Sequence, residues 1–206
     1  MSTLRDRETT TTQFRHASGR IMRLLIEEAL SQEMVVDSKT HYSPTGTSYE
    51  HFKLRHDDHD YCAVSILRAG DSMVEPFFDV MPEIAVGKIL IQRNERTADP
   101  IYYYHKLPTD ISGMKRVFIV DPMLGTGGSA AMAIKLVMEK GVPAENITFI
   151  NLVSCHRGLS RLLNEFPGVK IITAVVDPVL NEKFYIAPGL GDYGDRFFAS
   201  TRPPRS

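Results

Sequence analysis

Short apolar runs alternate with helical patterns along most of the chain. Four runs rich in aliphatic residues are typical of buried strands, and they cover residues 63–67, 117–120, 147–154 and 170–176. The segments around them predict helices at 18–30, 73–80, 130–139 and 156–165. Strands that alternate with helices at this spacing favour an α/β fold with a doubly wound, mainly parallel sheet flanked by helices.

Three further segments complete the expected architecture. The extended runs 88–92 and 101–106 flank a polar tip and predict a β-hairpin arm over residues 88–106, from which Arg93 or Arg96 either reaches a ligand or stays solvated. Residues 1–12 are polar and predict an exposed, flexible arm, with Ser18 as the N-cap of the first helix. Residues 41–46 predict a loop, and residues 49–54 a strand that enters the core.

Composition and charge narrow the classes of protein. The chain has 206 residues, enough for one domain spanning 1–206. Its 24 basic and 25 acidic residues nearly cancel, which argues against nucleic acid or a membrane surface as a partner. Cys62 and Cys155 lie in apolar runs, as buried free thiols of a reducing compartment do. Because we find neither a signal peptide nor a membrane-length apolar run, we expect a cytoplasmic protein.

The stretch after the strand at 117–120 carries the strongest chemical signal. It runs Asp121-Pro-Met-Leu-Gly-Thr-Gly-Gly-Ser129 and leads into a helix, so that backbone N–H groups and a helix N-terminus face one point. This arrangement predicts a phosphate site, with Asp121 available to sugar hydroxyls or a metal-bound water. An ATP-binding P-loop is excluded because no Lys follows Gly128, and the glycine spacing does not fit a dinucleotide fold. The alternative is a turn that only joins strand to helix.

A second strand also ends in a candidate loop, Arg68-Ala69-Gly70. The forked guanidinium of Arg68 suits phosphate oxygens, although it also suits a nearby carboxylate. Because ligands of open α/β sheets bind at the carboxyl ends of the strands, we expect Arg68 and Asp121 to lie close together. Asp177 ends another strand and is either a turn former or a site residue.

Two polar segments remain. Residues 185–195 contain a proline and several glycines and predict a shaped loop, whose free backbone groups suit a flat polar ligand and whose Asp192 and Asp195 suit hydroxyls or a hydrated metal. The run His56-Asp-Asp-His-Asp60 contains metal-ligand types, but its place just before a strand favours a solvated turn.

Taken together, these loops resemble those of the uracil phosphoribosyltransferase family, in the type I phosphoribosyltransferase superfamily. The similar motifs occur in the family's order, at 66–70, 92–97, 121–129 and 185–196, with Pro122 where most phosphoribosyltransferases have a second acid. Leu4-Arg-Asp and Phe14-Arg extend the resemblance over nearly the whole chain. The resemblance implies a type I fold in which residues 182–198 form a C-terminal, base-binding hood.

The resemblance also implies a reaction, in which uracil and 5-phosphoribosyl 1-diphosphate give UMP and diphosphate in pyrimidine salvage. Asp121, Arg68 and Asp192 are the implied catalytic residues, and Mg²⁺ arrives with the diphosphate without a direct protein ligand. The implied phosphoribosyl-diphosphate site comprises Arg68, Ala69, Gly70, Arg93, Asp121, Pro122, Met123, Leu124, Gly125, Thr126, Gly127, Gly128, Ser129 and Asp192. The implied uracil site comprises Tyr185, Ile186, Gly191, Asp192 and Tyr193.

The family further implies a homodimer or higher homo-oligomer to which the β-arm contributes, and GTP activation in some members. Two positions depart from the family pattern: Gly125 replaces the usual Ala, and Arg96 replaces a more common acid. A second hypothesis is a non-catalytic or regulatory domain of the same fold that senses nucleotides or binds RNA. The balanced charge argues against RNA, and the complete 185–195 loop argues against a decayed site.

Overall fold

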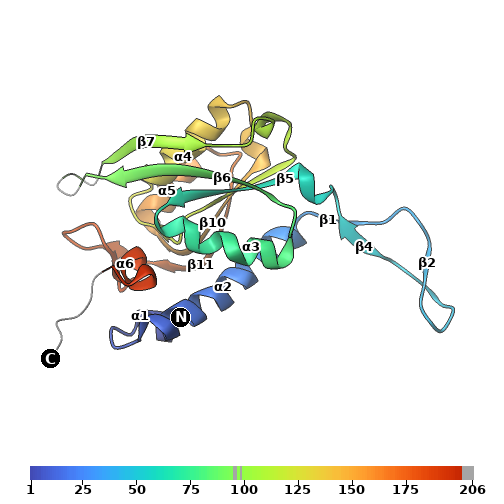
Figure 1. Cartoon of the computed structure of the whole chain (residues 1–206), viewed down its shortest axis with the longest axis horizontal. Helices are drawn as coiled ribbons and strands as arrows, with labels where there is room; N and C mark the ends of the chain where they lie inside the picture. Colours follow the sequence, from blue (N-terminus) through green and yellow to red (C-terminus); the bar gives the residue numbers. More distant parts are fainter. Residues whose placement is uncertain (95–96, 98, 201–206) are drawn as a thin grey trace.

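A mostly parallel sheet forms the centre of the structure, a computed structural model that describes residues 1–94, 97 and 99–200 (Figure 1). The strands run in the order β11-β10-β8-β5-β6-β7, with β9 paired to β10, and only β7 runs antiparallel to its neighbour. Their bounds are β5 Tyr61–Leu67, β6 Ala85–Arg93, β7 Pro100–Lys106, β8 Arg116–Val120, β9 Met123–Leu124, β10 Ile147–Cys155 and β11 Lys170–Asp177. The predicted α/β class is therefore confirmed.

Helices cover both faces of the sheet, since its central strands are apolar on both sides. Helices α2 (Thr11–Ser31) and α3 (Val74–Val80) share one core with Phe118, while α4 (Gly128–Glu139) and α5 (His156–Glu165) share the other with Val117 and Ile119. Successive residues of β8 thus point to opposite cores. Short 3-10 turns lie at η1 Asp58–Asp60, η2 Ala69–Met73, η3 Ile111–Gly113 and η4 Ala144–Asn146. Among the helices described, none is long and apolar enough to cross a membrane.

The N-terminal region differs from its prediction. Helix α2 begins seven residues before the expected start, because Thr10 and Gln13 form a reciprocal capping box; Ser18 is buried within the helix and is not its N-cap. Residues Ser2–Arg5 form α1, in which Leu4 is fully buried. This part of the segment 1–12 is therefore not the exposed arm that its polar composition predicts.

Residues 34–54 form a narrow ribbon that extends away from the sheet (Figure 1), and we call it the projecting arm. Strands β1 (Met34–Val36) and β4 (Phe52–Leu54) pair antiparallel, as do β2 (His41–Tyr42) and β3 (Ser48–Tyr49). The expected core strand at 49–54 is wrong, since Tyr49 and Phe52 are half exposed. Their apolar character alone did not distinguish a core strand from an exposed ribbon.

The opposite end of the sheet carries the loops of interest. Strands β6 and β7 pair antiparallel around the tip at 94–99, and Arg96 lies outside the described residues. The C-terminal region adds a small ladder of β12 (Val179–Leu180) and β13 (Ile186–Ala187), followed by α6 (Tyr193–Phe198). Cys62 and Cys155 are buried free thiols, as predicted.

A buried ion pair joins Glu33, between α2 and β1, to Arg116 at the start of β8. Arg116 donates to the Glu33 carboxylate from both Nε (2.8 Å) and Nη2 (2.7 Å), and its Nη1 donates to the carbonyl of Glu145. Both side chains are almost fully buried. The pair therefore joins three segments that are distant in sequence.

We predict that Glu33→Ala lowers the free energy of unfolding by about 3–5 kcal/mol, because Arg116 would remain buried without its partner. Urea unfolding followed by circular dichroism measures this change. Glu27→Ala, which removes an exposed carboxylate from α2, is the control and should change stability by less than about 0.5 kcal/mol. Equal effects of the two variants would contradict this role of the pair.

Candidate active site

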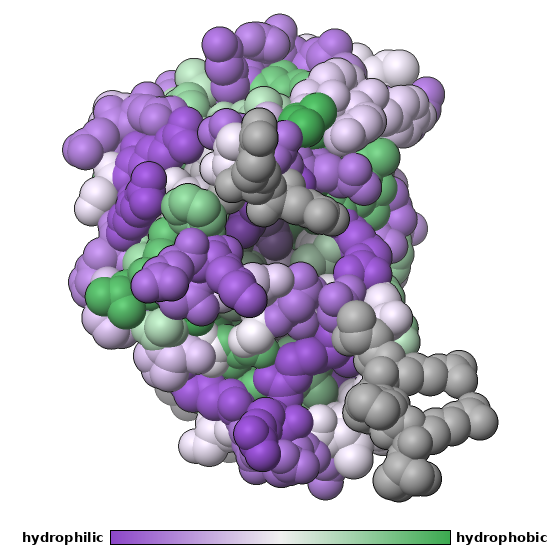
Figure 2. Space-filling model, turned by 90° about the vertical axis from the view of Figure 1, so that its left-hand side faces the viewer, coloured by the Kyte–Doolittle hydropathy of each residue, from purple (hydrophilic) through white to green (hydrophobic). Residues whose placement is uncertain are grey.

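A pocket of about 210 Å³ opens where the parallel strands end. Figure 2 shows this end of the molecule, with a hollow in a largely hydrophilic face. Three loops and the end of β6 form the pocket walls. The predicted residues that line it are Arg68, Ala69, Arg93, Asp121, Met123, Gly125, Ser129, Tyr185, Ile186, Gly191, Asp192 and Tyr193.

The loop after β8 is anchored to the neighbouring strand. Met123 and Leu124 form β9 on β10, and the carbonyl of Pro122 accepts from the N–H groups of Leu152 and Val153. The Leu124 side chain belongs to the core. Pro122 and Leu124 therefore shape the loop and do not line the pocket, unlike Met123 between them.

The glycines of this loop let it turn into α4. Gly127 is the N-cap with φ of +78°, and a Cβ there would lie 3.1 Å from the carbonyl oxygen of Gly158. Gly125 and Ser129 face the pocket beside Asp121, whereas Thr126 and Gly128 line a second hollow of about 220 Å³. Arg157 and Arg161 border that second hollow. These two cations were not among the predicted site residues, because the pattern of residues 156–165 predicted a helix and no ligand site.

Asp121 is the most perturbed acid of the pocket. Only 8% of the residue is exposed, and burial raises the pKa of its carboxyl from the ordinary 3.8 to about 6. The positive charge of Arg93 and the N–H of Met123, which lies 3.4 Å from Oδ1, oppose this rise in pKa. The carboxyl thus changes charge close to neutral pH.

Arg68 both lines the pocket and pairs with a carboxylate. Its Nη2 lies 2.6 Å from Oδ1 of Asp195, its Nη1 donates to Ser200, and its guanidinium carbon lies 5.6 Å from the centre of the Phe198 ring. About half of the side chain is exposed. A phosphate ligand would therefore compete with Asp195 for this guanidinium.

Gly70 has a structural role instead of lining the pocket. A Cβ at this position would lie 2.3 Å from the carbonyl oxygen of Val120, at the end of β8. Only glycine allows η2 to approach β8 so closely. The contact fixes the Arg68 loop against the Asp121 loop.

Two side chains of the hood that line the pocket are held by contacts within the protein. The ring of Tyr193 is buried near Phe14 and Phe197, with centroid distances of 5.2 and 5.6 Å. The Tyr193 hydroxyl lies 3.2 Å from Oγ of Ser72, and burial raises the pKa of the phenol to about 12. Asp192 caps α6 by accepting from the Asp195 N–H at 2.8 Å.

The N-terminal segment holds the hood in place. Arg5 donates to both oxygens of Asp177, at 2.6 and 2.9 Å, and the same carboxylate accepts from the Gly189 N–H at 2.9 Å. These contacts lower the pKa of Asp177, with the Arg5 hydrogen bond as the largest cause. Gly189 itself has φ of +55°, and a Cβ there would overlap the carbonyl of Ile186. Asp177, whose role the sequence left open, is therefore an anchor of the hood.

Arg196 makes a second connection between the hood and the N-terminus. Its guanidinium donates to the carbonyls of Leu4, Asp6 and Leu190 and stacks over the ring of Phe14, 4.3 Å from the centroid. A planar group with several donors suits this set of acceptors. The sequence motifs that contain Leu4-Arg5-Asp6 and Arg196 pointed to these positions without indicating that they touch.

Comparisons with known proteins cover nearly the whole chain. A family model described as uracil phosphoribosyltransferase matches residues 1–200. Proteins named uracil phosphoribosyltransferase are 42% identical in Saccharomyces cerevisiae, over 95% of this chain and 88% of that protein, and 44% identical in Dictyostelium discoideum, over 96% and 89%. The AQ2163 protein of Aquifex aeolicus superposes with a TM-score of 0.81 at 31% identity, covering 98% of this chain and 93% of that one. The chain belongs to the uracil phosphoribosyltransferase family and has its type I phosphoribosyltransferase fold.

Proposed function

We propose that the protein transfers the phosphoribosyl group of 5-phosphoribosyl 1-diphosphate to uracil, giving UMP and diphosphate. The observation that carries this proposal is the meeting of three loops in one pocket: Arg68 after β5, Asp121 after β8 and the hood. A non-catalytic nucleotide sensor is the second candidate. It would not need the buried acid of altered pKa that the pocket retains.

The phosphoribosyl donor would occupy the pocket from the Asp121 loop to Arg68. Gly125 in the turn and Ser129 at the start of α4 offer backbone and hydroxyl donors to the 5-phosphate. Arg68 and Arg93 are the cations available to the diphosphate, with Asp192 at the same wall. Thr126, Gly127 and Gly128 support the phosphate turn, and Gly70, Pro122 and Leu124 hold its shape.

Breaking the bond between C1 of the ribose and the diphosphate builds positive charge on the sugar and negative charge on the leaving group. The Asp121 carboxylate would orient the ribose and favour the positive charge, while Arg68 would stabilise the departing diphosphate. We propose that Mg²⁺ arrives with the diphosphate and is held by the substrate phosphates, without a direct protein ligand. When bound with the diphosphate, Mg²⁺ would neutralise part of its charge.

Backbone groups of the hood would select uracil. We propose that the Gly191 N–H donates to O4 of uracil and the Ile186 carbonyl accepts from N3–H, beside Tyr185 at the same wall. The Tyr193 phenol is already paired with Ser72, so this residue would contribute its backbone. Cytosine would place a donor against a donor and leave a buried group unpaired, which disfavours it strongly.

The direct test is an incubation of purified protein with labelled uracil, 5-phosphoribosyl 1-diphosphate and Mg²⁺. We expect labelled UMP, while ligand binding without turnover would favour the sensor. Adding GTP to the same assay tests the proposed activation, which the family resemblance alone supports.

We also propose a cytoplasmic location, in agreement with the free thiols, and fluorescence microscopy of a tagged chain tests it.

We predict that Asp121→Asn lowers turnover by two orders of magnitude or more, because the neutral amide cannot favour positive charge on the ribose. The kcat/KM of the natural protein should fall as the pH drops through about 6, where the carboxyl gains a proton, and the variant should lack this dependence. Steady-state UMP formation between pH 5 and 9 measures both effects. Asp57→Asn, at an exposed acid, is the control.

The same substitution should stabilise the fold at high pH. The folded state raises the pKa of Asp121 above its unfolded value. The free energy of unfolding therefore falls as the pH rises from 3.8 through about 6, because the buried carboxyl loses its proton. At pH 8 the buried charge costs roughly 2–3 kcal/mol, which Asn avoids, whereas near pH 4 the advantage should shrink. Thermal unfolding at both pH values checks the sign, and a variant less stable at pH 8 would contradict it.

We predict that Asp177→Asn raises the KM for uracil about tenfold while changing kcat and the KM for the phosphoribosyl donor less than about threefold. The carboxylate positions the hood through Arg5 and Gly189 without lining the pocket. Asp79→Asn removes an exposed Arg–Asp pair elsewhere and should leave all three constants unchanged. Equal increases in both KM values would indicate a general loss of folded protein instead.

We propose a homodimer or higher homo-oligomer, supported by two exposed apolar surfaces. Tyr103 and its neighbours lie on the edge strand β7, and Phe52 lies on the projecting arm, each about half exposed. Light scattering of the natural protein should give at least twice the chain mass. Tyr103→Ser and Phe52→Ser should reveal which surface is used, and a monomeric natural protein would refute the proposal.

A further inference from the structure

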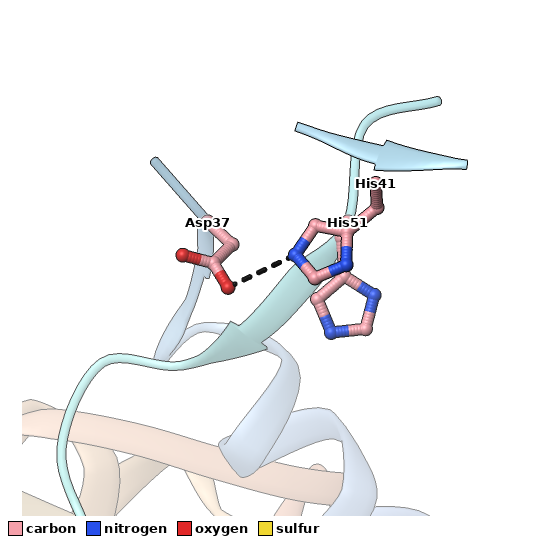
Figure 3. A group of neighbouring side chains, drawn as sticks. All are labelled: Asp37, His41 and His51. Atoms are coloured by element: carbon pink, nitrogen blue, oxygen red, sulfur yellow. Dashed lines mark hydrogen bonds and ion pairs between the residues drawn. The ribbon is translucent and has the colours of Figure 1, made fainter. Parts of the chain in front are cut away.

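The projecting arm brings three metal-ligand side chains together far from the pocket. Asp37 directly follows β1 and His51 directly precedes β4, and the Asp37 N–H donates to the His51 carbonyl at 2.7 Å. His41, the first residue of β2, turns back towards Asp37 (Figure 3). One ligand atom from each residue lies within 4.8 Å of the other two. The cluster thus connects the β1–β4 ladder with the β2–β3 ladder.

The spacing of these atoms suits a tetrahedral ion. Nε2 of His41 lies 3.1 Å from Oδ2 of Asp37, and two ligand atoms on tetrahedral Zn²⁺ lie about 3.3 Å apart. His51 stacks on His41 with a centroid distance of 4.2 Å and a tilt of 31°, so a rotation of its ring would bring the third ligand into place. Two imidazoles and a carboxylate form a donor set typical of Zn²⁺.

The surroundings of the cluster allow an ion to enter. A hollow of about 410 Å³ lies between residues 36–40 and 48–51 and includes Asp37 and His51. The side chain of Asp37 is 10% exposed and that of His41 30% exposed, so both are partly shielded without being closed off. A fourth position would remain for water, as in zinc sites with three protein ligands.

Two lysines lie near the cluster and oppose a cation: Lys39 lines the same hollow, and Lys53 pairs directly with Asp37. Its Nζ lies 3.3 Å from Oδ1 of Asp37, the carboxylate oxygen that does not face His41. The Lys53 side chain is about half exposed, so it can move into solvent when an ion arrives. Lys53 should therefore weaken metal binding through charge repulsion without blocking the site.

We propose that Asp37, His41 and His51 bind one Zn²⁺ ion that cross-links the two ladders of the projecting arm. The strands of this arm have only two or three residues each, and Val36, Tyr42 and Phe52 are half exposed or more. Within one chain, little apolar burial is available to fix such a ribbon, so a metal cross-link would stabilise it. The projecting arm extends from the end of the sheet opposite to α6 and the β6–β7 tip (Figure 1), and Arg93 of β6 and Tyr193 of α6 line the pocket. The metal site is therefore separate from the pocket and does not depend on the proposed reaction.

The test uses the full chain without a histidine tag, treated with a chelator and then titrated with Co²⁺. We expect one Co²⁺ per chain, visible absorption bands typical of tetrahedral coordination by nitrogen and oxygen, and displacement by one equivalent of Zn²⁺. His41→Ala and His51→Ala should each weaken binding at least tenfold, as judged by competition with a calibrated zinc indicator. Hydrogen exchange of residues 34–54 should slow when Zn²⁺ is added.

Two control variants sharpen the result. His59→Ala removes an exposed histidine paired with Glu83 and should leave Zn²⁺ affinity unchanged, whereas Lys53→Gln should increase it several-fold. Circular dichroism establishes that each variant is folded. The proposal is overturned if the natural chain takes up no Co²⁺ or Zn²⁺ at about 100 micromolar metal, the highest concentration of the titration. It is also overturned if the folded His51→Ala chain binds the metal as tightly as the natural chain.

Discussion

The parallel pairing of β5 with β8 is the constraint on which the site depends. Ser65 lies opposite Val120, so the two strands end at the same edge and deliver Arg68 and Asp121 to one pocket. The close packing at Gly70 leaves no room for a side chain between the two loops. Strand β10 then fixes the Asp121 loop from the other side through β9 and the Pro122 carbonyl. The loop at residues 121–129 is therefore held by neighbouring elements on both sides.

The third wall of the pocket is positioned by the opposite end of the chain. Arg5 and Arg196 connect the hood to residues 4–6, and Phe14 packs beside Tyr193 beneath it. Most of these contacts run from a charged side chain to backbone carbonyls or to one buried carboxylate. Such contacts have a defined direction, which suits a loop whose own backbone must present particular donors and acceptors.

Arg68 has a carboxylate partner in the structure that a bound phosphate ligand would replace. Arg68 is paired with Asp195 on α6, while Asp121 is buried with a raised pKa near Arg93. A diphosphate at Arg68 would displace Asp195 and thereby change how α6 is held. With the donor bound at Arg68 as we propose, its binding and the placement of the hood would be coupled, because the same guanidinium would serve both.

The sequence pattern by itself determined the central strands, most of the helices, the glycine-rich turn at 121–129 and the order of the three loops. It could do so because hydrophobic periodicity and glycine-rich turns are properties of residues that are neighbours in the sequence. The start of α2 was not predicted because the Thr10–Gln13 capping box extends the helix into a polar segment. The projecting arm and the burial of Leu4 were not predicted because apolar residues look alike whether they pack or project. The Arg5–Asp177 anchor, the altered pKa of Asp121 and the meeting of Asp37, His41 and His51 were decided only by the tertiary structure. Each depends on distance or desolvation between residues that the chain brings together only on folding.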